Sequence, residues 1–279
     1  MIQFTELSKR YGTITAIDRL TAEISGNGIY GLLGKNGAGK TTLMKLLGAR
    51  LYPTQGNISV FGKQVSPYDQ SPSVHFIENS GEQFNMRISD LIDAAYRVQG
   101  VFDVDFARRM ARAFELDQRK TYKQLSLGMK SMVAAILSLA NTAPVLLLDE
   151  PALGLDPVMR EQFNTLLYES YTAHERIIII STHLVDDLAR ITEKLIVFDK
   201  GKILLQTDIT EIDSHAYTLT GPRAVLLPLV ETLNCIGKTS AGSILSARIY
   251  DEWIDPPAGV TLERLSLQDF FITLVGGLS

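Results

Sequence analysis

A glycine-rich loop constrains the fold of this chain more than any other feature. Residues 34–41 read Gly-Lys-Asn-Gly-Ala-Gly-Lys-Thr and match the pattern G-x-x-x-x-G-K-[ST]. The apolar residues 29–33 before the loop predict a buried strand, and residues 41–51 carry apolar side chains at helical spacing. A strand, a glycine loop and a helix in this order are typical of a phosphate-binding site, although a glycine-rich turn before an ordinary helix is the alternative.

Each part of this loop has a predicted role toward a nucleotide. The glycines allow backbone N–H groups to approach phosphate oxygens, and the positive end of the following helix adds to the attraction. Lys40 is expected to reach the β- and γ-phosphates of ATP, and the Thr41 hydroxyl is expected to ligate Mg²⁺. The predicted nucleotide contacts of the loop are Gly34, Asn36, Gly37, Ala38, Gly39, Lys40, Thr41 and Thr42.

Two acidic residues follow a second apolar run. Residues 145–148 are Val-Leu-Leu-Leu, the pattern of a strand buried on both faces, and Asp149 and Glu150 come directly after it. Ligands bind beyond the carboxyl ends of such strands, so both acids are expected beside the phosphate loop. Asp149 suits Mg²⁺ ligation, and Glu150 suits a base that orients or deprotonates a water molecule. The alternative is a pair of solvated loop acids.

A histidine follows a third apolar run. Residues 177–180 are four isoleucines, and His183 comes soon after them. A histidine at this strand end is predicted to donate to the γ-phosphate or to position the attacking water, although a lone histidine also suits a structural role. Three strand ends would then converge on one site.

The periodicity of the remaining chain predicts an α/β protein with a mainly parallel sheet. Short β-rich segments up to about residue 25 predict an N-terminal antiparallel layer, and residues 86–140 predict an inserted helical subdomain. Asp156 is expected to cap a helix that continues to about residue 171. We therefore assign residues 1–207 to one nucleotide-binding domain and residues 208–279 to a small α+β appendage with a capped last helix.

Composition limits the surroundings in which this chain can work. Twenty-seven basic and 31 acidic residues give a net charge of -4 with no Lys/Arg block, which argues against nucleic acid as a partner. The apolar runs fall far short of the roughly 20 residues that a membrane-spanning helix needs, and we recognise no export signal. The single cysteine, Cys235, suits a reducing compartment, and we expect a cytoplasmic protein without direct membrane insertion.

A short motif before a strongly apolar helical segment offers a second phosphate-facing surface. Residues 125–129 read Leu-Ser-Leu-Gly-Met, and the Ser126 hydroxyl lies at the predicted start of a helix, where an anion can bind. The alternative is a serine that only caps the helix.

The order of these motifs, from about residue 1 to residue 206, resembles that of the ATP-binding subunits of ABC transporters, which have a P-loop NTPase core. The resemblance implies ATP hydrolysis with Mg²⁺ by two cassettes that pair head to tail. Ser126 and Gly128 would then act on the nucleotide held by the partner's loop. The resemblance also implies that Tyr11 stacks on adenine and that Asp156 belongs to a loop at the dimer interface; an ordinary turn tyrosine and a helix cap are the alternatives.

This sequence departs from the family pattern at three places. Glu78 stands where the family usually has the glutamine that links Mg²⁺ to the helical subdomain, a place where a glutamate can also serve as a ligand. Leu-Ser-Leu-Gly-Met replaces Leu-Ser-Gly-Gly-Gln and is similar to the motif of bacterial exporter subunits that pair with a separate six-helix permease. Ser131 and Met132 stand where that subgroup usually carries a glutamine and an arginine.

The resemblance implies a motor subunit that lies peripherally on the inner face of the cell membrane. Its expected partners are an integral-membrane permease and a second nucleotide-binding subunit, either an identical or a different chain, and export is the expected direction. A soluble ABC-type ATPase that is not coupled to transport, such as a cluster-assembly factor, is the main alternative. A small-molecule kinase with the same loop would need an acceptor site and usually a mobile lid.

Overall fold

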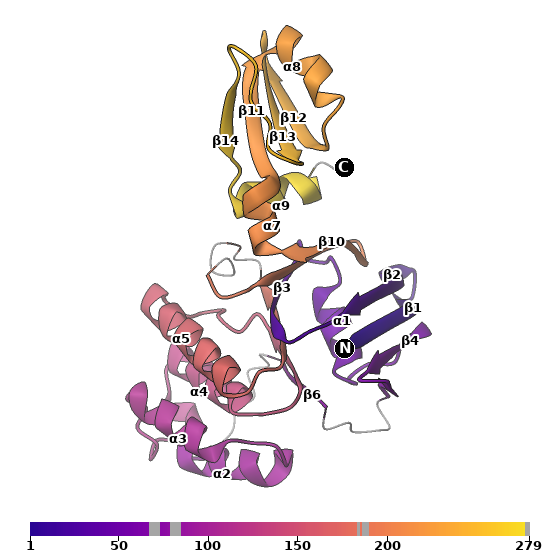
Figure 1. Ribbon diagram of the computed structural model, residues 1–279. Helices are drawn as coiled ribbons and strands as arrows, with labels where there is room; N and C mark the ends of the chain where they lie inside the picture. The colour runs from indigo at the N-terminus through magenta and orange to yellow at the C-terminus, as the bar shows by residue number, and fades with distance from the viewer. Residues whose placement is uncertain (67–72, 79–84, 183–184, 186–189, 277–279) are drawn as a thin grey trace.

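The computed structural model describes residues 1–66, 73–78, 85–182, 185 and 190–276. Figure 1 shows an elongated molecule in which a smaller C-terminal part stands on a larger body. The described residues form a six-stranded sheet and a four-stranded sheet in the body and another four-stranded sheet in the C-terminal part. None of the helices in these ranges combines the length and the apolar content that a membrane-spanning helix requires.

The six-stranded sheet confirms the predicted, mainly parallel arrangement. Its strands lie in the order β10-β9-β3-β8-β7-β6, and every neighbouring pair is parallel except β10 and β9. The bounds are Gly28–Leu33 (β3), Val74–Glu78 (β6), Val145–Asp149 (β7), Ile177–Thr182 (β8), Lys194–Asp199 (β9) and Lys202–Asp208 (β10). The apolar runs of β7 and β8 arise because both faces of this sheet are covered.

An antiparallel sheet at the N-terminal side also confirms the prediction. Its strands, in the order β2-β1-β4-β5, are Ile14–Ile24 (β2), Ile2–Tyr11 (β1), Gln55–Val60 (β4) and Lys63–Gln64 (β5). Helix α1 (Lys40–Leu47) contributes its apolar side chains to a core that contains residues of both sheets. The prediction that α1 continues to residue 51 is wrong. Ala49 adopts a φ of 55°, and the Arg50 N–H donates to the Lys45 carbonyl at 2.7 Å, a contact that closes the helix.

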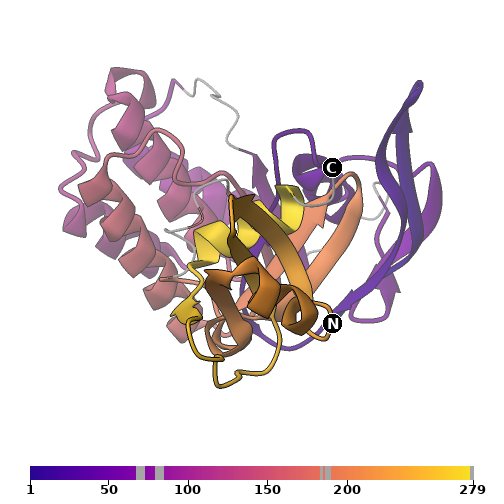
Figure 2. The ribbon, with the colours of Figure 1, turned by 90° about the horizontal axis from the view of Figure 1, so that it is seen from above.

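Helices cover the other face of the central sheet, and Figure 2 shows this helical layer and the N-terminal sheet on opposite sides of the molecule. The elements are α2 (Ile88–Gln99), α3 (Val104–Ala113), the 3₁₀ turn η1 (Tyr122–Gln124), α4 (Leu127–Leu139) and α5 (Pro157–Ala173). Alternate residues of β7 serve two cores. Leu146 and Leu148 pack with the helical layer, whereas Val145 and Leu147 pack in the core that holds α1.

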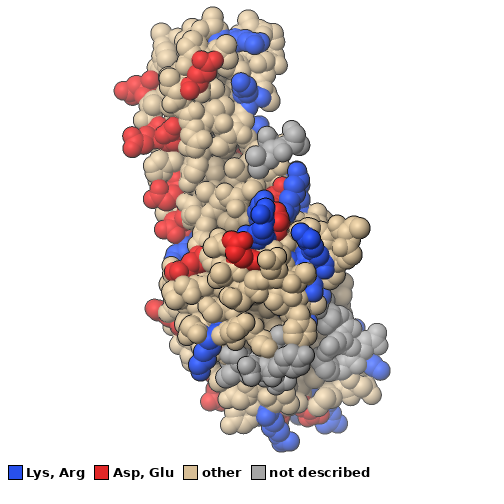
Figure 3. All heavy atoms as spheres, turned by 90° about the vertical axis from the view of Figure 1, so that its right-hand side faces the viewer, with Lys and Arg blue, Asp and Glu red and all other residues tan. Residues whose placement is uncertain are grey.

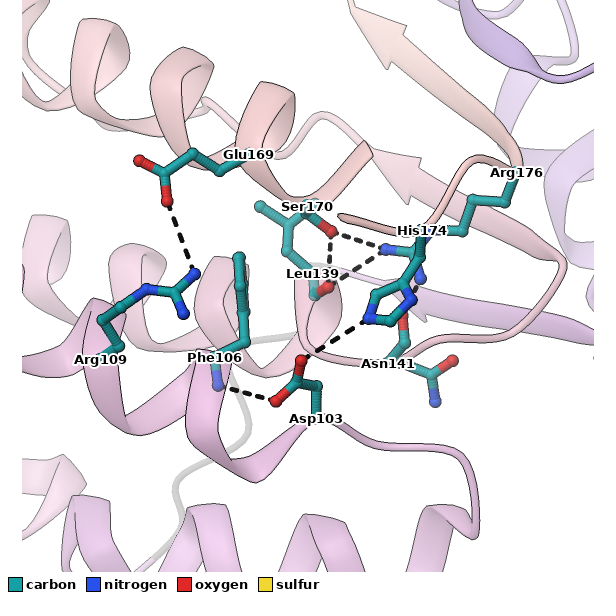
Figure 4. A network of polar contacts seen from close by, with 9 residues as sticks. All are labelled: Asp103, Phe106, Arg109, Leu139, Asn141, Glu169, Ser170, His174 and Arg176. Carbon is teal, nitrogen blue, oxygen red and sulfur yellow. Dashed lines mark hydrogen bonds and ion pairs between the residues drawn. The ribbon is translucent and has the colours of Figure 1, made fainter. Parts of the chain in front are cut away.

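A buried arginine connects the helical layer to the start of β8. Arg176 is 2% exposed and donates to the carbonyl oxygens of Leu139, at 3.1 Å, and Asn141, and to the Ser170 hydroxyl at 2.7 Å. Figure 4 shows these acceptors around the guanidinium group. Burial lowers the pKa of Arg176 to about 10. The carbonyl groups at the C-terminal end of α4 supply the negative partial charge that stabilises this cation.

The C-terminal part is an antiparallel sheet with helices around it. Its strands, in the order β12-β13-β11-β14, are Cys235–Ala241 (β12), Ile244–Tyr250 (β13), Ala216–Pro222 (β11) and Thr261–Arg264 (β14). Helix α8 (Arg223–Val230) packs on one face, and α7 (Ile209–His215) and α9 (Leu267–Gly276) lie between this sheet and the body (Figure 1). Ser266 Oγ accepts from the Asp269 N–H at 3.0 Å, which confirms the predicted cap. The domain boundary at residue 208 stays a prediction.

Candidate active site

The phosphate loop connects β3 to α1 in a conformation that requires glycine. A Cβ atom at Gly34 or Gly39 would come closer than 3.0 Å to a backbone carbonyl oxygen, that of Phe198 or Ala16 respectively. Gly39 also adopts a φ of 109° and Gly37 a φ of 81°, a region that L side chains rarely adopt. The glycines of the motif therefore let the loop pack directly against β2 and β9.

Lys40 is buried at the start of α1, and its ammonium group points back at the loop. Nζ donates to the carbonyl oxygens of Gly34, at 2.7 Å, and Lys35, at 3.2 Å. Burial lowers the pKa of Lys40, and the negative charges of Glu150 and Asp149 counteract this effect. The two acids therefore lie close enough to the loop lysine to interact with it electrostatically.

Ser181 connects the two acids. Its hydroxyl donates to Oδ1 of Asp149 and accepts from the backbone N–H of Glu150 at 3.1 Å. Sequence reasoning did not identify Ser181 as a site residue. The signal was present in the strand ends, because β7 and β8 run in parallel and place Ser181 opposite Asp149.

Glu150 has an unusual backbone conformation. Its φ of 49° lies in the left-handed region, which costs a residue other than glycine about 1 kcal/mol or more. The Glu150 carbonyl accepts from the Leu153 N–H at 3.1 Å, so hydrogen bonds hold the turn on both sides. Strained conformations of this kind persist where the surrounding structure fixes them, and they gather at active sites.

The backbone register brings several strand ends to one edge of the sheet. Asp149 lies opposite Glu78 of β6 on one side and opposite Ser181 of β8 on the other. Strand β3, which leads into the loop, pairs with β8 in register. The Glu78 side chain and His183 lie outside the described residues, so the roles of both stay predictions.

The Leu-Ser-Leu-Gly-Met motif starts α4, and its serine caps the helix. Ser126 Oγ accepts from the Met129 N–H at 3.3 Å, and the residue is exposed. Asp156 caps α5 in the same way, at 2.9 Å from the Met159 N–H. Gly128 lies against Met159, whose Sδ would be 2.8 Å from a Cβ atom at that glycine. The capping roles are confirmed, and the roles of Ser126, Gly128 and Asp156 toward a partner chain stay predictions.

Tyr11 ends β1 at the tip of the first hairpin. The residue is 46% exposed, and its ring centroid lies 5.3 Å from Nζ of Lys9. An exposed aromatic ring suits stacking on a base, and the predicted contact with adenine stays a prediction. In the loop, Asn36 and Thr41 are exposed and Thr42 is half-buried.

These residues fit a magnesium-bound nucleoside triphosphate. At Gly34 and Gly39 of the loop a Cβ atom would clash with neighbouring backbone, and the ammonium group of Lys40 lies against the loop carbonyl groups of Gly34 and Lys35. Lys40 and the N-terminal end of α1 supply positive charge for phosphate groups. The Thr41 hydroxyl and the Asp149 carboxylate offer the oxygen ligands that Mg²⁺ prefers.

Comparisons with known proteins agree with this geometry. A family model described as ABC transporter matches residues 17–153. The lantibiotic transport ATP-binding protein SrtF of Streptococcus pyogenes is 30% identical over 210 residues, which cover 75% of this chain and 91% of the relative. The Nod factor export ATP-binding protein I of Ralstonia nicotianae is 28% identical over 301 residues, which cover 97% of this chain and 92% of the relative. A solved structure, the dimeric structure of MJ0796, a bacterial ABC transporter cassette, has a TM-score of 0.64 at 20% identity, over 75% of this chain and 99% of that chain.

Proposed function

Because this chain belongs to the family of ATP-binding subunits of ABC transporters, we propose that it hydrolyses ATP between two paired cassettes and thereby drives a membrane permease. The observation that carries the proposal is the placement of Lys40, which is buried in the glycine loop and interacts electrostatically with Glu150 and Asp149. A positive group that can bind phosphate thus lies at the same place as carboxylates that can act on a metal ion and on water.

The side chains of the site divide the work of hydrolysis in this proposal. Lys40 and the loop N–H groups neutralise charge on the phosphates. Glu150 orients the attacking water and accepts its proton, and the left-handed turn of its backbone fixes where the carboxylate acts. Ser181 holds Asp149 and the Glu150 backbone in one arrangement. We propose that His183 donates to the γ-phosphate or positions the attacking water.

The same site would hold Mg²⁺. Thr41, Asp149 and Glu78 are the residues proposed to bind it, either directly or through water. When bound, Mg²⁺ stabilises the negative charge that develops on the phosphate oxygens. The register of β6 and β7 supports the place of Glu78 in this set, because its backbone lies opposite that of Asp149.

Exposed apolar side chains support the pairing with a second cassette. Leu127 at the start of α4 is 71% exposed, and Leu153 and Val158 near the start of α5 are 56% and 70% exposed. Leu127 lies beside Gly154, because a Cβ atom added at Gly154 would be 3.5 Å from Cδ2 of Leu127. Exposed apolar groups that lie together mark interaction surfaces. We propose that this surface, with the exposed Ser126, faces the nucleotide of a second subunit, either an identical or a homologous chain.

Helix α2 supports contact with a permease. Tyr96 and Val98 are 58% and 84% exposed, and Met86 just before the helix is 40% exposed. Figure 3 shows Lys and Arg side chains mixed with Asp and Glu side chains on one face of the described residues, a surface more suited to protein partners than to a polyanion. A permease bound at α2 would keep the subunit at the inner face of the membrane.

Export is the direction that we propose. The Nod factor relative is an export protein by name and aligns with 97% of this chain, including the C-terminal part. The lantibiotic transport relative supports a transporter without stating a direction for this chain. In this proposal the permease determines which substrate is transported.

Two measurements test the proposed function. The purified chain should release phosphate from ATP in a Mg²⁺-dependent reaction that Lys40→Ala abolishes. The full chain should also fractionate with the membranes of its own cells, and Val98→Asp should weaken that association without lowering hydrolysis. Hydrolysis by a chain that stays wholly in the soluble fraction would instead favour an ABC-type ATPase that is not coupled to transport.

A further inference from the structure

The last turn of α9 reaches the phosphate loop. Nζ of Lys35, the second residue of the loop, donates to the carbonyl oxygen of Val275 at 3.3 Å. Val275 is 2% exposed and belongs, with Phe270 of the same helix, to the core cluster of the body that also contains Leu33. Figure 2 shows α9 lying across the body, between the helical layer and the N-terminal sheet.

Lys35 also determines the shape of the loop from within. Its carbonyl oxygen accepts from Nζ of Lys40 at 3.2 Å and from the N–H of the buried Ala38 at 3.1 Å. The ammonium group that is to meet the phosphates is therefore anchored in part on Lys35. A displacement of Lys35 would move one of the two carbonyl groups that hold Lys40 in place.

The C-terminal sheet fixes the other side of α9. The Phe270 ring packs edge-on against Tyr250 of β13, with 5.1 Å between the ring centroids. On β12, a Cβ atom at Gly237 would come closer than 3.0 Å to Cγ2 of Thr273. The Thr273 hydroxyl donates to the Asp269 carbonyl at 2.7 Å, so this side chain is itself held on the helix. Gly237 thus permits a close approach that leaves α9 little freedom to shift.

We propose that α9 positions the phosphate loop. Its Val275 carbonyl, at the negative end of the helix, holds the Lys35 ammonium group and so keeps the loop in the shape that binds ATP. A continuous series of contacts links the C-terminal sheet to the loop, from Gly237 through Thr273, Val275 and Lys35 to Lys40. Through these contacts the C-terminal sheet controls the affinity of the loop for nucleotide. This inference rests on the proposed function, because it requires ATP to bind at the loop.

A substitution remote from the loop tests the proposal. Gly237→Ala forces Thr273 and α9 away from β12. We expect the KM for ATP to rise about fivefold, the effect of weakening one charged, partly exposed hydrogen bond, while kcat changes less than about twofold. A merely structural role would lower kcat through loss of folded protein and would leave KM unchanged.

A second substitution provides the matched control. Thr273→Ser removes the clashing Cγ2 atom but keeps the hydroxyl that bonds to Asp269. Thr273→Ser alone should have the wild-type KM, and the combination of Gly237→Ala with Thr273→Ser should restore it. A raised KM that the second substitution does not correct contradicts transmission through this contact.

A substitution in the loop tests the proposal without disturbing the packing of α9. Lys35→Met in the full chain removes the ammonium group that the Val275 carbonyl holds and should raise KM to a similar extent, and Gly237→Ala should then cause no further increase. Wild-type KM in both Lys35→Met and Gly237→Ala overturns the positioning role. That result is distinct from failure of the proposed function, in which the wild-type chain itself would hydrolyse no ATP.

Discussion

The Ser181 hydroxyl donates a hydrogen bond to the Asp149 carboxylate, and the same oxygen accepts the backbone N–H of Glu150. Ser181 is 0% exposed. A single buried residue therefore orients the Asp149 carboxylate through its hydroxyl and holds the Glu150 N–H through both its hydroxyl and its carbonyl oxygen. Removing this hydroxyl would take one hydrogen bond from the charged Asp149 carboxylate, whereas the Glu150 N–H would keep the Ser181 carbonyl, at 3.1 Å, as an acceptor.

Ser181→Ala should therefore slow hydrolysis. It removes a hydrogen bond to a charged group and leaves Asp149 with one donor fewer, so we expect kcat to fall about 10- to 100-fold, with a smaller change in KM. Steady-state hydrolysis measures this effect. Ser138→Ala is the control, because Ser138 is also a buried serine but donates to the Ala134 carbonyl of its own helix at 2.6 Å. A kcat within twofold of the wild-type value in Ser181→Ala would contradict the positioning of the acids by Ser181.

The sequence predicts the features of this molecule that depend on neighbouring residues. The loop at residues 34–41 and the apolar runs before Asp149 and His183 are local patterns, and local patterns carry the strand, turn and helix preferences directly. The parallel order of the strands then follows, because such runs need cover on both faces. Ligands bind beyond the carboxyl ends of parallel strands, and this rule predicts that Asp149 lies near Lys40.

Features that depend on distant parts of the chain could not be predicted. The Lys35–Val275 contact joins residues 240 positions apart, and no local pattern encodes it. The left-handed backbone of Glu150 has no sequence signal because the residue is not glycine. The end of α1 was missed because Ala49, which adopts the left-handed conformation there, is a strong helix former.

Arg176→Met should strongly destabilise the fold. The substitution leaves the Leu139 and Asn141 carbonyl groups and the Ser170 hydroxyl without the guanidinium donor (Figure 4). We expect the free energy of unfolding to fall by about 2–4 kcal/mol, as measured by urea denaturation.

Arg109→Met is the matched control for that substitution. Arg109 and Glu169 form an ion pair at 3.8 Å with side chains that are 57% and 45% exposed, so solvent screens the pair and little stability should be lost. Equal losses in the two variants would contradict a special role of Arg176 between α4 and β8.

His75 should make stability depend on pH. Burial lowers its pKa to about 4, and the positive charges of Arg176 and Arg50 act in the same direction. The unfolded chain, with a pKa near 6.5, binds more protons between these two values. The free energy of unfolding should therefore decrease as pH falls through this window, by up to about 3 kcal/mol below pH 4.

Comparison of two histidine variants isolates this effect. Urea denaturation near pH 7 and near pH 5 should show a smaller loss of stability on acidification in His75→Gln than in the wild-type chain. His174→Gln removes an exposed histidine that pairs with Asp103 at 3.6 Å and serves as the control. An unchanged pH dependence in His75→Gln would show that other groups cause the acid sensitivity.

The measurement that tests the central claim most directly compares Glu150→Gln with the wild-type chain in ATP and Mg²⁺. Glutamine keeps the shape of the side chain but cannot accept the proton of water, so we expect no phosphate release and a stable ATP-dependent dimer in gel filtration with light scattering. Glu169→Gln, at a half-exposed acid on α5, should hydrolyse ATP normally. If neither chain dimerises, the second cassette is a different protein. Normal turnover by Glu150→Gln would contradict the assignment of Glu150 as the base and, with it, the proposed mechanism.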